Sequence, residues 1–349
     1  MSAGWYPRAI TFGGGGARIV GSMGVLSHLI ESGLTEHVTD WYGASAGAFC
    51  ALFAAIGGSG TWVWEVSKIF DGATASVIRE DYVCDFTKTW GVSSSTPLSD
   101  ILGKLVDTWE SGCSAWTFAD LLRNRPGTQI HILATNLTSK KPGLFNLANS
   151  PNMRIIDAIC ASAAVPLFYV PWVHPTTGDM YCDGGILEVF PWKCIPNKHE
   201  TLVIACSDAD IIGRKNPKIP ITNIFEYITR VISLFRADEG IIPLYWIAVN
   251  VKNIHFMEFH MAKEEQLAAF EEGVRSAKGW LAFRASMLNS PEGMSGMRPF
   301  SDRRNKESVV HLLSGGMSDS PIRDISQPLS GPLPDSHRQK THRVRRWSL

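Results

Sequence analysis

The hydrophobic pattern of the first sixty residues alternates between that of buried strands and that of helices. Residues 8–12 and 38–42 are short apolar runs, each followed by glycine, and they predict buried β-strands. Apolar residues recur at helical spacing over 19–30, and Gly33 follows as the expected C-terminal cap. A second apolar helix is predicted over 46–56. This order of strand, helix, strand and helix predicts a parallel sheet with right-handed crossovers.

The rest of the chain continues the alternation and then loses it. Further strands are predicted over residues 129–134, 180–182 and 201–206, and further helices over residues 96–109, 154–164, 223–235 and 266–287. From about residue 289 the sequence is rich in Ser, Pro, Gly and Arg and poor in apolar residues, which predicts disorder. We therefore expect one α/β domain over 8–285, with a largely parallel sheet, and a disordered basic tail over 286–349.

Composition and charge narrow the class of protein. Of the 349 residues, 45% are hydrophobic and 19% charged, as in ordinary soluble globular proteins. The 33 basic residues balance 33 acidic ones, which argues against a nucleic-acid partner. The balance is uneven, because residues 298–349 hold 10 Lys and Arg against 5 Asp and Glu. This leaves a net charge of about −5 on residues 1–297.

The cysteines and the uncharged stretches of the sequence indicate the cellular compartment of the protein. The seven cysteines are odd in number and lack C-x-x-C spacing, so we expect neither a disulfide framework nor a zinc site. Residues 1–11 lack the pattern of a signal peptide. The stretches 41–64 and 158–178 are interrupted by glycines or prolines and fall short of the roughly 20 apolar residues of a spanning helix. We expect a cytoplasmic protein.

The strongest chemical signal is G-A-S-A-G, residues 43–47, between a predicted strand and a predicted helix. A serine on such a tight turn exposes its hydroxyl, and Gly43 and Gly47 allow the backbone to reverse sharply. Amides at the start of the following helix, including that of Ala46, can stabilise a developing oxyanion. Ser45 is thus a candidate nucleophile. The alternative is a turn of small residues that packs a helix against a sheet.

A glycine run follows the first predicted strand. In Gly14-Gly15-Gly16-Ala17-Arg18 the backbone amides are unhindered and can hold a negative charge. Nucleotide binding fits poorly, because no Gly-Lys-Ser/Thr follows and Ile19 stands where the dinucleotide pattern needs glycine. Two adjacent strand-to-helix turns of a parallel sheet open at the same edge. The glycine run and Ser45 together therefore predict an acyl-transfer site.

A serine nucleophile needs a base, and the sequence offers two kinds. Asp183 opens D-G-G at 183–185, where the glycines leave its carboxylate room to approach the serine. An aspartate in an ordinary turn is the commoner meaning of D-G. His199, His255 and His260 follow Asp183 in the order that an α/β-hydrolase requires, so a histidine-dependent triad stays open.

These blocks, in this order, resemble the patatin-like phospholipases. The glycine run, the G-A-S-A-G turn and D-G-G match the three blocks of that family. Three further segments resemble its connecting segments: T-F-A-D-L at 117–121, A-T-N-L at 134–137 and A-S-A-A-V-P at 161–166. The resemblance covers roughly residues 8–205. It implies a three-layer fold with helices on both faces of a central sheet.

The resemblance also implies a mechanism. Ser45 would be the nucleophile and Asp183 the base of a dyad without histidine. The amides of Gly14, Gly15, Gly16 and Ala46 would form the oxyanion hole. Gly184, Gly185 and Arg18 would support the loops, and Arg18 could also pair with a lipid phosphate. The alternative for Arg18 is a solvated arginine in the first turn of the helix. The substrate would be a fatty-acyl ester of a phospholipid or neutral lipid, hydrolysed without metal or cofactor at a membrane or lipid-droplet surface.

Two positions depart from the family pattern. Ile19 stands where the family usually has glycine, and Val189 stands where it usually has asparagine. Because a β-branched residue resists positive φ, we expect ordinary helical dihedrals at Ile19. The departures motivate one alternative, a catalytically weak lipid- or membrane-binding protein of the same fold. A His-dependent α/β-hydrolase is the other.

The end of the chain has a composition of its own. Residues 335–349 hold five Lys and Arg against one acidic residue, with Trp347 and Leu349 among them. Such a segment can attract an anionic leaflet, and Ser348 follows basic residues in a manner that basophilic kinases prefer. A solvated tail without function is the alternative.

Overall fold

The computed structural model describes residues 5–75, 86–206, 243–251 and 261–288, together with residues 227, 230, 231 and 254. All of them lie in the first of two compact units, residues 1–315. Most of the helix predicted over 223–235 lies outside the described residues, as do His255, His260 and the tail from residue 289 onward.

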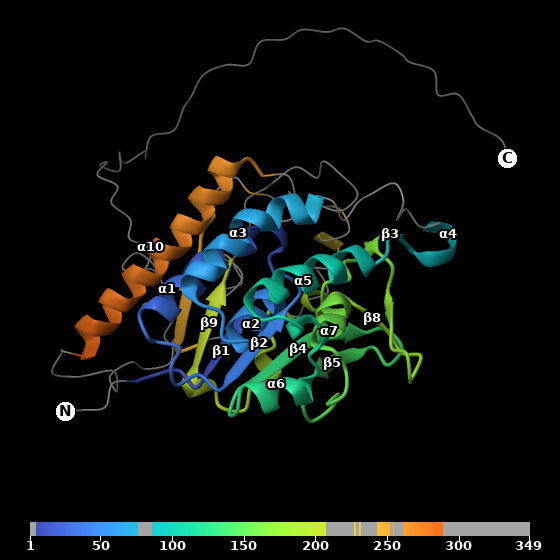
Figure 1. Ribbon diagram of the computed structural model, residues 1–349, viewed down its shortest axis with the longest axis horizontal. Coiled ribbons are helices and arrows are strands. Elements are labelled where there is room, and N and C mark those ends of the chain that lie inside the picture. Colours follow the sequence, from blue (N-terminus) through green and yellow to red (C-terminus); the bar gives the residue numbers. More distant parts are fainter. Residues whose placement is uncertain are drawn as a thin grey trace, which may run out of the picture. The chain divides into compact units, whose positions relative to one another are not determined.

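A central sheet of eight strands runs through this unit (Figure 1). Its strands are β1 (Ala9–Phe12), β2 (Asp40–Ala44), β4 (Gln129–Asn136), β5 (Lys141–Phe145), β7 (Trp172–Val173), β8 (Met180–Cys182), β9 (Thr201–Ala205) and β10 (Tyr245–Ala248). The order is β10-β9-β1-β2-β4-β8-β7, with β5 also paired to β4. The first five strands of this order are parallel, whereas β5 and β8 run antiparallel to β4, and β7 antiparallel to β8. The predicted α/β class with a largely parallel sheet is confirmed.

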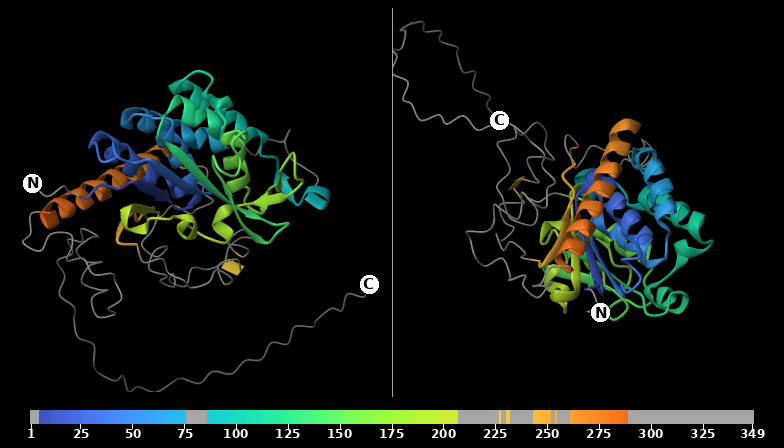
Figure 2. Two further views of the ribbon diagram at one scale, coloured as in Figure 1. Left: turned by 90° about the horizontal axis from the view of Figure 1, so that it is seen from below. Right: turned by 90° about the vertical axis from the view of Figure 1, so that its left-hand side faces the viewer.

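The described helices pack on the sheet and on one another (Figure 2). They are α1 (Ile19–Glu31), α2 (Gly47–Ala55), α3 (Gly60–Ala75), α4 (Phe86–Thr89), α5 (Thr96–Trp109), α6 (Phe118–Asn124), α7 (Ile155–Ser162) and α10 (Lys263–Leu288). Helices α2 and α7 pack on the sheet, α1 packs between β9 and α3, and α5 packs on α3 and α7. Helix α10 lies along α1, where a Cβ on Gly273 would come within 1.9 Å of the Gly21 carbonyl oxygen.

Five 3₁₀ turns and a small second sheet complete the described fold. The turns are η1 (Gly16–Arg18), η3 (Cys113–Ala115), η4 (Gly184–Ile186), η5 (Trp192–Cys194) and η6 (Lys198–Glu200). The small sheet pairs β3 (Gly91–Ser93) with β6 (Leu167–Tyr169) in parallel. In the described part of the chain, no helix has the length and apolar character needed to cross a bilayer.

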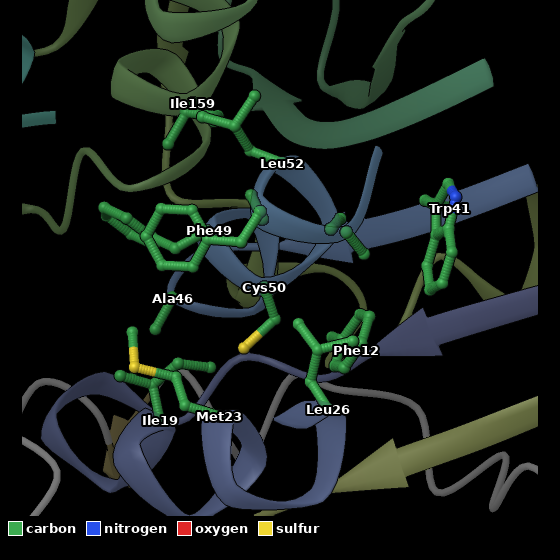
Figure 3. Packing of buried hydrophobic residues seen from close by; sticks show 14 of the residues in the cluster. Phe12, Ile19, Met23, Leu26, Trp41, Ala46, Phe49, Cys50, Leu52 and Ile159 are labelled. Carbon is green, nitrogen blue, oxygen red and sulfur yellow. The ribbon is translucent and has the colours of Figure 1, made fainter. Parts of the chain in front are cut away.

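Side chains alternate between the two faces of the sheet, as the strand period requires. Ile10 and Phe12 of β1 are fully buried in the main core. Phe12 lies beside side chains of α1 and α2 (Figure 3). Ala9 of the same strand packs with Tyr42 and Ile195 on the opposite face. Among the described residues, the segment 189–195 covers that second face and leads from the D-G-G loop back toward β9.

Candidate active site

Strand register brings two chain segments to the same level on β4. Strand β2 ends opposite Leu133, and β8 ends opposite Thr135. Since β2 is parallel and β8 antiparallel to β4, the next residue of each strand is level with Ala134. Those two residues are Ser45 and Asp183. Both follow strands on the same edge of β4, opposite β5, because Ile132 pairs with Gly43 and Phe145, and Thr135 pairs with Cys182 and Pro142. The sheet therefore places the predicted nucleophile and the predicted base together, although they are 138 residues apart in sequence.

The Ser45 hydroxyl donates a hydrogen bond to Asp183 Oδ2 at 2.5 Å. The other carboxylate oxygen, Oδ1, accepts from the Gly185 amide at 2.8 Å. The backbone of Asp183 is held as well, because its N–H donates to the Ala164 carbonyl and its carbonyl accepts from Thr135 Oγ1, both at 2.9 Å. With only 7% of its surface exposed, Asp183 has one oxygen anchored and the other directed at the serine.

The turn that carries Ser45 is strained. Ser45 has φ 51° and is one of four non-glycine residues with positive φ in the described part of the chain. Such a conformation costs on the order of 1–3 kcal/mol and persists only where the surroundings enforce it. A Cβ on Gly47 would lie 2.4 Å from the Phe12 carbonyl oxygen, and one on Gly43 would meet the first turn of α2. Both glycines are required by the close approach of α2 to the ends of the strands.

The glycine run lies directly against the serine. A Cβ on Gly14 would be 3.2 Å from Ser45 Cβ and 3.9 Å from its Oγ. The Gly14 amide, which the sequence analysis included among the oxyanion donors, donates instead to the Val189 carbonyl at 3.0 Å. This hydrogen bond occupies its only proton. Gly14 thus joins the glycine run to the segment that follows D-G-G.

The other amides named in the sequence analysis are not occupied in this way. Those of Gly15, Gly16 and Ala46 have no acceptor among the residues that the structure describes. Gly16 has φ 56°, a left-handed conformation that suits glycine. Arg18 is partly buried, and its Nε lies 3.4 Å from the Gly15 carbonyl oxygen, a long hydrogen bond that constrains the loop weakly.

Both departures from the family pattern fit the local structure. Ile19 has φ −56° and ψ −26°, which confirms the expected helical dihedrals. Its side chain is fully buried and points with Met23 from α1 toward α2 (Figure 3). Val189 packs against the small cluster of Phe190, Val203 and Ala205, and its backbone carbonyl accepts from the Gly14 amide. A backbone acceptor at this position does not depend on the side chain.

The histidine alternative receives no support from the described residues. His199 is exposed in η6, just before β9 begins, and so lies at the amino edge of the sheet, across from Ser45. His255 and His260 lie outside the described residues. A group of three or more His, Cys, Asp and Glu able to hold a metal ion is absent from the part of the chain that the structure describes.

A buried histidine that the sequence analysis did not name lies toward the amino edge. His131 Nε2 is 2.8 Å from Asp40 Oδ1, and its Nδ1 is 3.2 Å from Asn146 Nδ2. Its ring stacks on that of Tyr42, with centroids 4.2 Å apart. Burial works to raise the pKa of Asp40, but hydrogen bonds from His131 and Thr39 outweigh it and leave this pKa below its ordinary value.

Three residues near the dyad had no predicted role. Ser162 accepts from the Ser45 amide at 2.8 Å, and Thr135 holds the Asp183 backbone. Both lie in segments that carried the family resemblance, which is the one signal that could have found them. Burial and the adjacent Asp183 carboxylate raise the pKa of the Cys182 thiol to about 12, so this thiol is protonated at neutral pH and is a poor competing nucleophile.

Comparison with known proteins gives relatives of low identity. An uncharacterized protein of Acanthamoeba polyphaga mimivirus is 24% identical over 290 residues, which cover 77% of this chain and 92% of that protein. A probable lipid hydrolase of Invertebrate iridescent virus 6 is 23% identical over 186 residues, covering 53% of this chain and 62% of that protein.

A solved structure shows the same fold. VipD from Legionella pneumophila superimposes with a TM-score of 0.56 at 13% identity, covering 80% of this chain and 67% of that one. The family model described as patatin-like phospholipase matches residues 10–193, a span that contains the glycine run, Ser45 and Asp183. Since this span is more than half of the 349 residues, the chain belongs to the patatin-like phospholipase family.

Proposed function

We propose that this protein is a serine lipid acyl hydrolase, phospholipase A-like, in which Ser45 is the nucleophile and Asp183 its base. The observation that carries the proposal is the 2.5 Å hydrogen bond from Ser45 Oγ to Asp183 Oδ2 on a strained turn at the carboxyl edge of the sheet. Family membership and the similarity to a probable lipid hydrolase support lipid ester hydrolysis in general.

In the acylation step, Asp183 Oδ2 takes the hydroxyl proton as Ser45 Oγ bonds to the carbonyl carbon of the ester. The carbonyl oxygen becomes an oxyanion, which the amides of Gly15, Gly16 and Ala46 are suited to stabilise. When the tetrahedral intermediate collapses, the bond to the alcohol oxygen breaks. Asp183 returns its proton to that oxygen, and the acyl group remains on Ser45.

Deacylation repeats these steps with water. Asp183 takes a proton from a water molecule whose oxygen attacks the acyl carbon, and the bond from that carbon to Ser45 Oγ then breaks. Oγ recovers the proton from Asp183 and the fatty acid leaves. Throughout the cycle the Gly185 amide holds Oδ1, so Oδ2 remains the oxygen that exchanges the proton.

The departures at Ile19 and Val189 motivated the alternative of an inactive lipid-binding protein. Each is accommodated without disturbing the contact between Ser45 and Asp183, because Ile19 is an ordinary helical core residue and Val189 acts through its backbone. This favours the hydrolase over the binding protein.

Incubation with lipid distinguishes the hydrolase from the lipid-binding protein directly. Purified protein and its Ser45→Ala variant would be mixed with phospholipid vesicles and, separately, with a triacylglycerol emulsion, and released fatty acids would be measured by mass spectrometry. We expect release by the wild type alone, and the lipid that is consumed identifies the substrate class. Vesicle binding by folded wild-type protein without fatty acid release would support the binding protein instead.

We extend the proposal to the lipid surface at which the protein meets its substrate. We place the protein at a peripheral membrane or lipid-droplet surface, with residues 335–349 as an electrostatic contact. Each basic residue near an anionic leaflet contributes on the order of 1 kcal/mol, less as salt screens it. Deleting residues 335–349 should weaken co-sedimentation with phosphatidylserine vesicles at low salt and leave hydrolysis of a soluble ester unchanged. Equal co-sedimentation of both proteins would remove the tail from the proposal.

A further inference from the structure

Ser162 connects three segments that form the site. It is the last residue of α7, and none of its surface is exposed. Its Oγ accepts a hydrogen bond from the Ser45 amide at 2.8 Å and donates one to the Leu133 carbonyl at 2.6 Å. The D-G-G loop reaches the same point, because a Cβ on Gly184 would lie 2.0 Å from the Leu133 oxygen and 3.3 Å from Ser162 Oγ.

The direction of these hydrogen bonds is fixed. A serine hydroxyl has one proton, and a carbonyl oxygen can only accept, so the proton of Ser162 must point to Leu133. A lone pair of Oγ is then free to accept from Ser45 N–H. The resulting chain, from amide to hydroxyl to carbonyl, is buried and has both of its donors satisfied. Such a chain resists rearrangement because an unpaired buried N–H costs about 1–3 kcal/mol.

The Ser45 amide needs an acceptor outside the sheet, and Ser162 Oγ provides it. Ser45 is past the end of β2 and in the left-handed region at φ 51°, so its amide does not take part in the strand ladder. Ser162 is the partner that the fold supplies for this amide. The Ser45 amide is thereby also excluded from the oxyanion hole, since its proton is already donated.

We infer that Ser162 is a positioning residue for the nucleophile: it fixes the left-handed turn so that Ser45 Oγ meets Asp183 Oδ2. The inference rests on the proposed hydrolase function. Ser162 touches no substrate and acts through the Ser45 backbone. Without its hydroxyl the amide loses its acceptor, the turn relaxes, and a displacement of Ser45 Oγ by ~1 Å would lower the rate on the order of 100-fold.

The experiment measures how fast Ser45 reacts, separately from how well the protein folds. A long-chain alkyl fluorophosphonate phosphonylates a reactive serine, and its inactivation kinetics give a maximal rate, kinact, and a binding constant, KI. The variants are Ser162→Ala and Ser162→Cys, with the folded fraction of each taken from near-ultraviolet circular dichroism. The matched control is Ser27→Ala, since Ser27 is also buried and donates to a backbone carbonyl, that of Gly60, at 3.0 Å.

We expect Ser162→Ala to lower kinact per folded molecule on the order of 100-fold, with KI within about twofold of wild type. Ser162→Cys should recover part of the rate, because a thiol is a weak acceptor and donor. Ser27→Ala should lose some thermal stability and keep kinact. If Ser162→Ala does not fold, the reduced kinact of Ser162→Cys at unchanged KI carries the test.

Two outcomes overturn the inference. One is a wild-type kinact in folded Ser162→Ala, or in folded Ser162→Cys where the alanine variant does not fold, which would make the hydroxyl a structural feature only. The other is a change confined to KI, which would place Ser162 in lipid binding. Failure of the proposed function looks different, because the wild-type protein itself would then react no faster than its Ser45→Ala variant.

Discussion

Near each end of the neighbouring strands β2 and β4, a carboxylate is hydrogen-bonded to another side chain. Toward the amino edge, Asp40 meets His131 at 2.8 Å. At the carboxyl edge, Asp183 accepts the Ser45 hydroxyl at 2.5 Å. Each pair joins an acid to a group that can give or take a proton, and each is largely shielded from solvent. Pairing alone therefore does not distinguish a catalytic pair from a structural one.

The surroundings of the two pairs differ. Both ring nitrogens of His131 have partners, its ring stacks on Tyr42, and the backbone around it is regular strand. Around Ser45 the backbone is left-handed, and neighbouring amides of the glycine run have no acceptor in the described structure. At the amino edge the polar groups of the pair have hydrogen-bond partners. At the carboxyl edge the Ser45 backbone is strained, and nearby amides have no acceptor among the described residues. These are the features that a developing oxyanion needs.

The largest expected effect comes from exchanging the two aspartates for asparagine. Asp183→Asn removes the proposed general base and should lower kcat for a soluble fatty-acyl ester about 10³-fold, whereas Asp40→Asn should leave kcat unchanged. Steady-state kinetics on folded protein check both. His199→Ala, exposed at the amino edge, serves as a further silent control. A similar loss of kcat in Asp40→Asn would remove the distinction between the two edges.

Next in size is the effect of Ile19→Gly, which restores the residue that the family usually has. Ile19 is fully buried, so loss of its side chain costs roughly 2–5 kcal/mol, and glycine in a helix costs about 1 kcal/mol more. We expect the free energy of unfolding to fall by about 4 kcal/mol, measured by urea denaturation, with no gain in activity per folded molecule. Greater stability in the variant would mean that isoleucine strains the loop.

His131→Ala should cost stability and leave the chemistry intact. The ring is buried beside Tyr42 and its polar partners, and its loss removes the hydrogen-bond partner of Asp40 Oδ1 and of Asn146 Nδ2. We expect a loss of about 2–3 kcal/mol in the free energy of unfolding. Hydrolysis per folded molecule should match wild type. If kcat falls while the fold is retained, the amino-edge pair has a part in catalysis.

The smallest effect is a pH dependence at Asp40. Its pKa in the folded protein is below the ordinary 3.8, so the folded state favours the ionised form. The stability that this supplies is fully present above pH 3.8 and is lost as the pH falls through the lower folded pKa. Chemical denaturation from pH 6 to about pH 2.5 should show a steeper acid loss for wild type than for Asp40→Asn. Parallel curves would contradict the direction of the shift.

Local patterns predicted much of the sheet and its main helices. The helix expected over 96–109 is α5, and Ser95 occupies its N-cap. Helix α3 was not among the predicted helices, although its buried residues Val63 and Val66 have the helical spacing i, i+3. Strand β5 was missed because Pro142 and Gly143 are uncommon in strands.

The candidate site likewise has features that the sequence could predict and features that it could not. The turn chemistry of G-A-S-A-G and D-G-G is local, so the sequence could indicate Ser45 and Asp183. The register of antiparallel β8 on β4 is not local, and neither is the hydrogen bond between Ser45 and Ser162, which are 117 residues apart. Nor could the sequence indicate that the Gly14 amide is taken by Val189. Such contacts depend on the assembled sheet.

The central claim is that Ser45 is a nucleophile activated by Asp183. Its most direct test is mapping of the covalent adduct that a long-chain alkyl fluorophosphonate forms with the folded protein, by intact mass and peptide sequencing. We expect one adduct per chain, on Ser45, absent in Ser45→Ala and formed far more slowly in Asp183→Asn. An adduct on a different serine, or equal rates in wild type and Asp183→Asn, would contradict it.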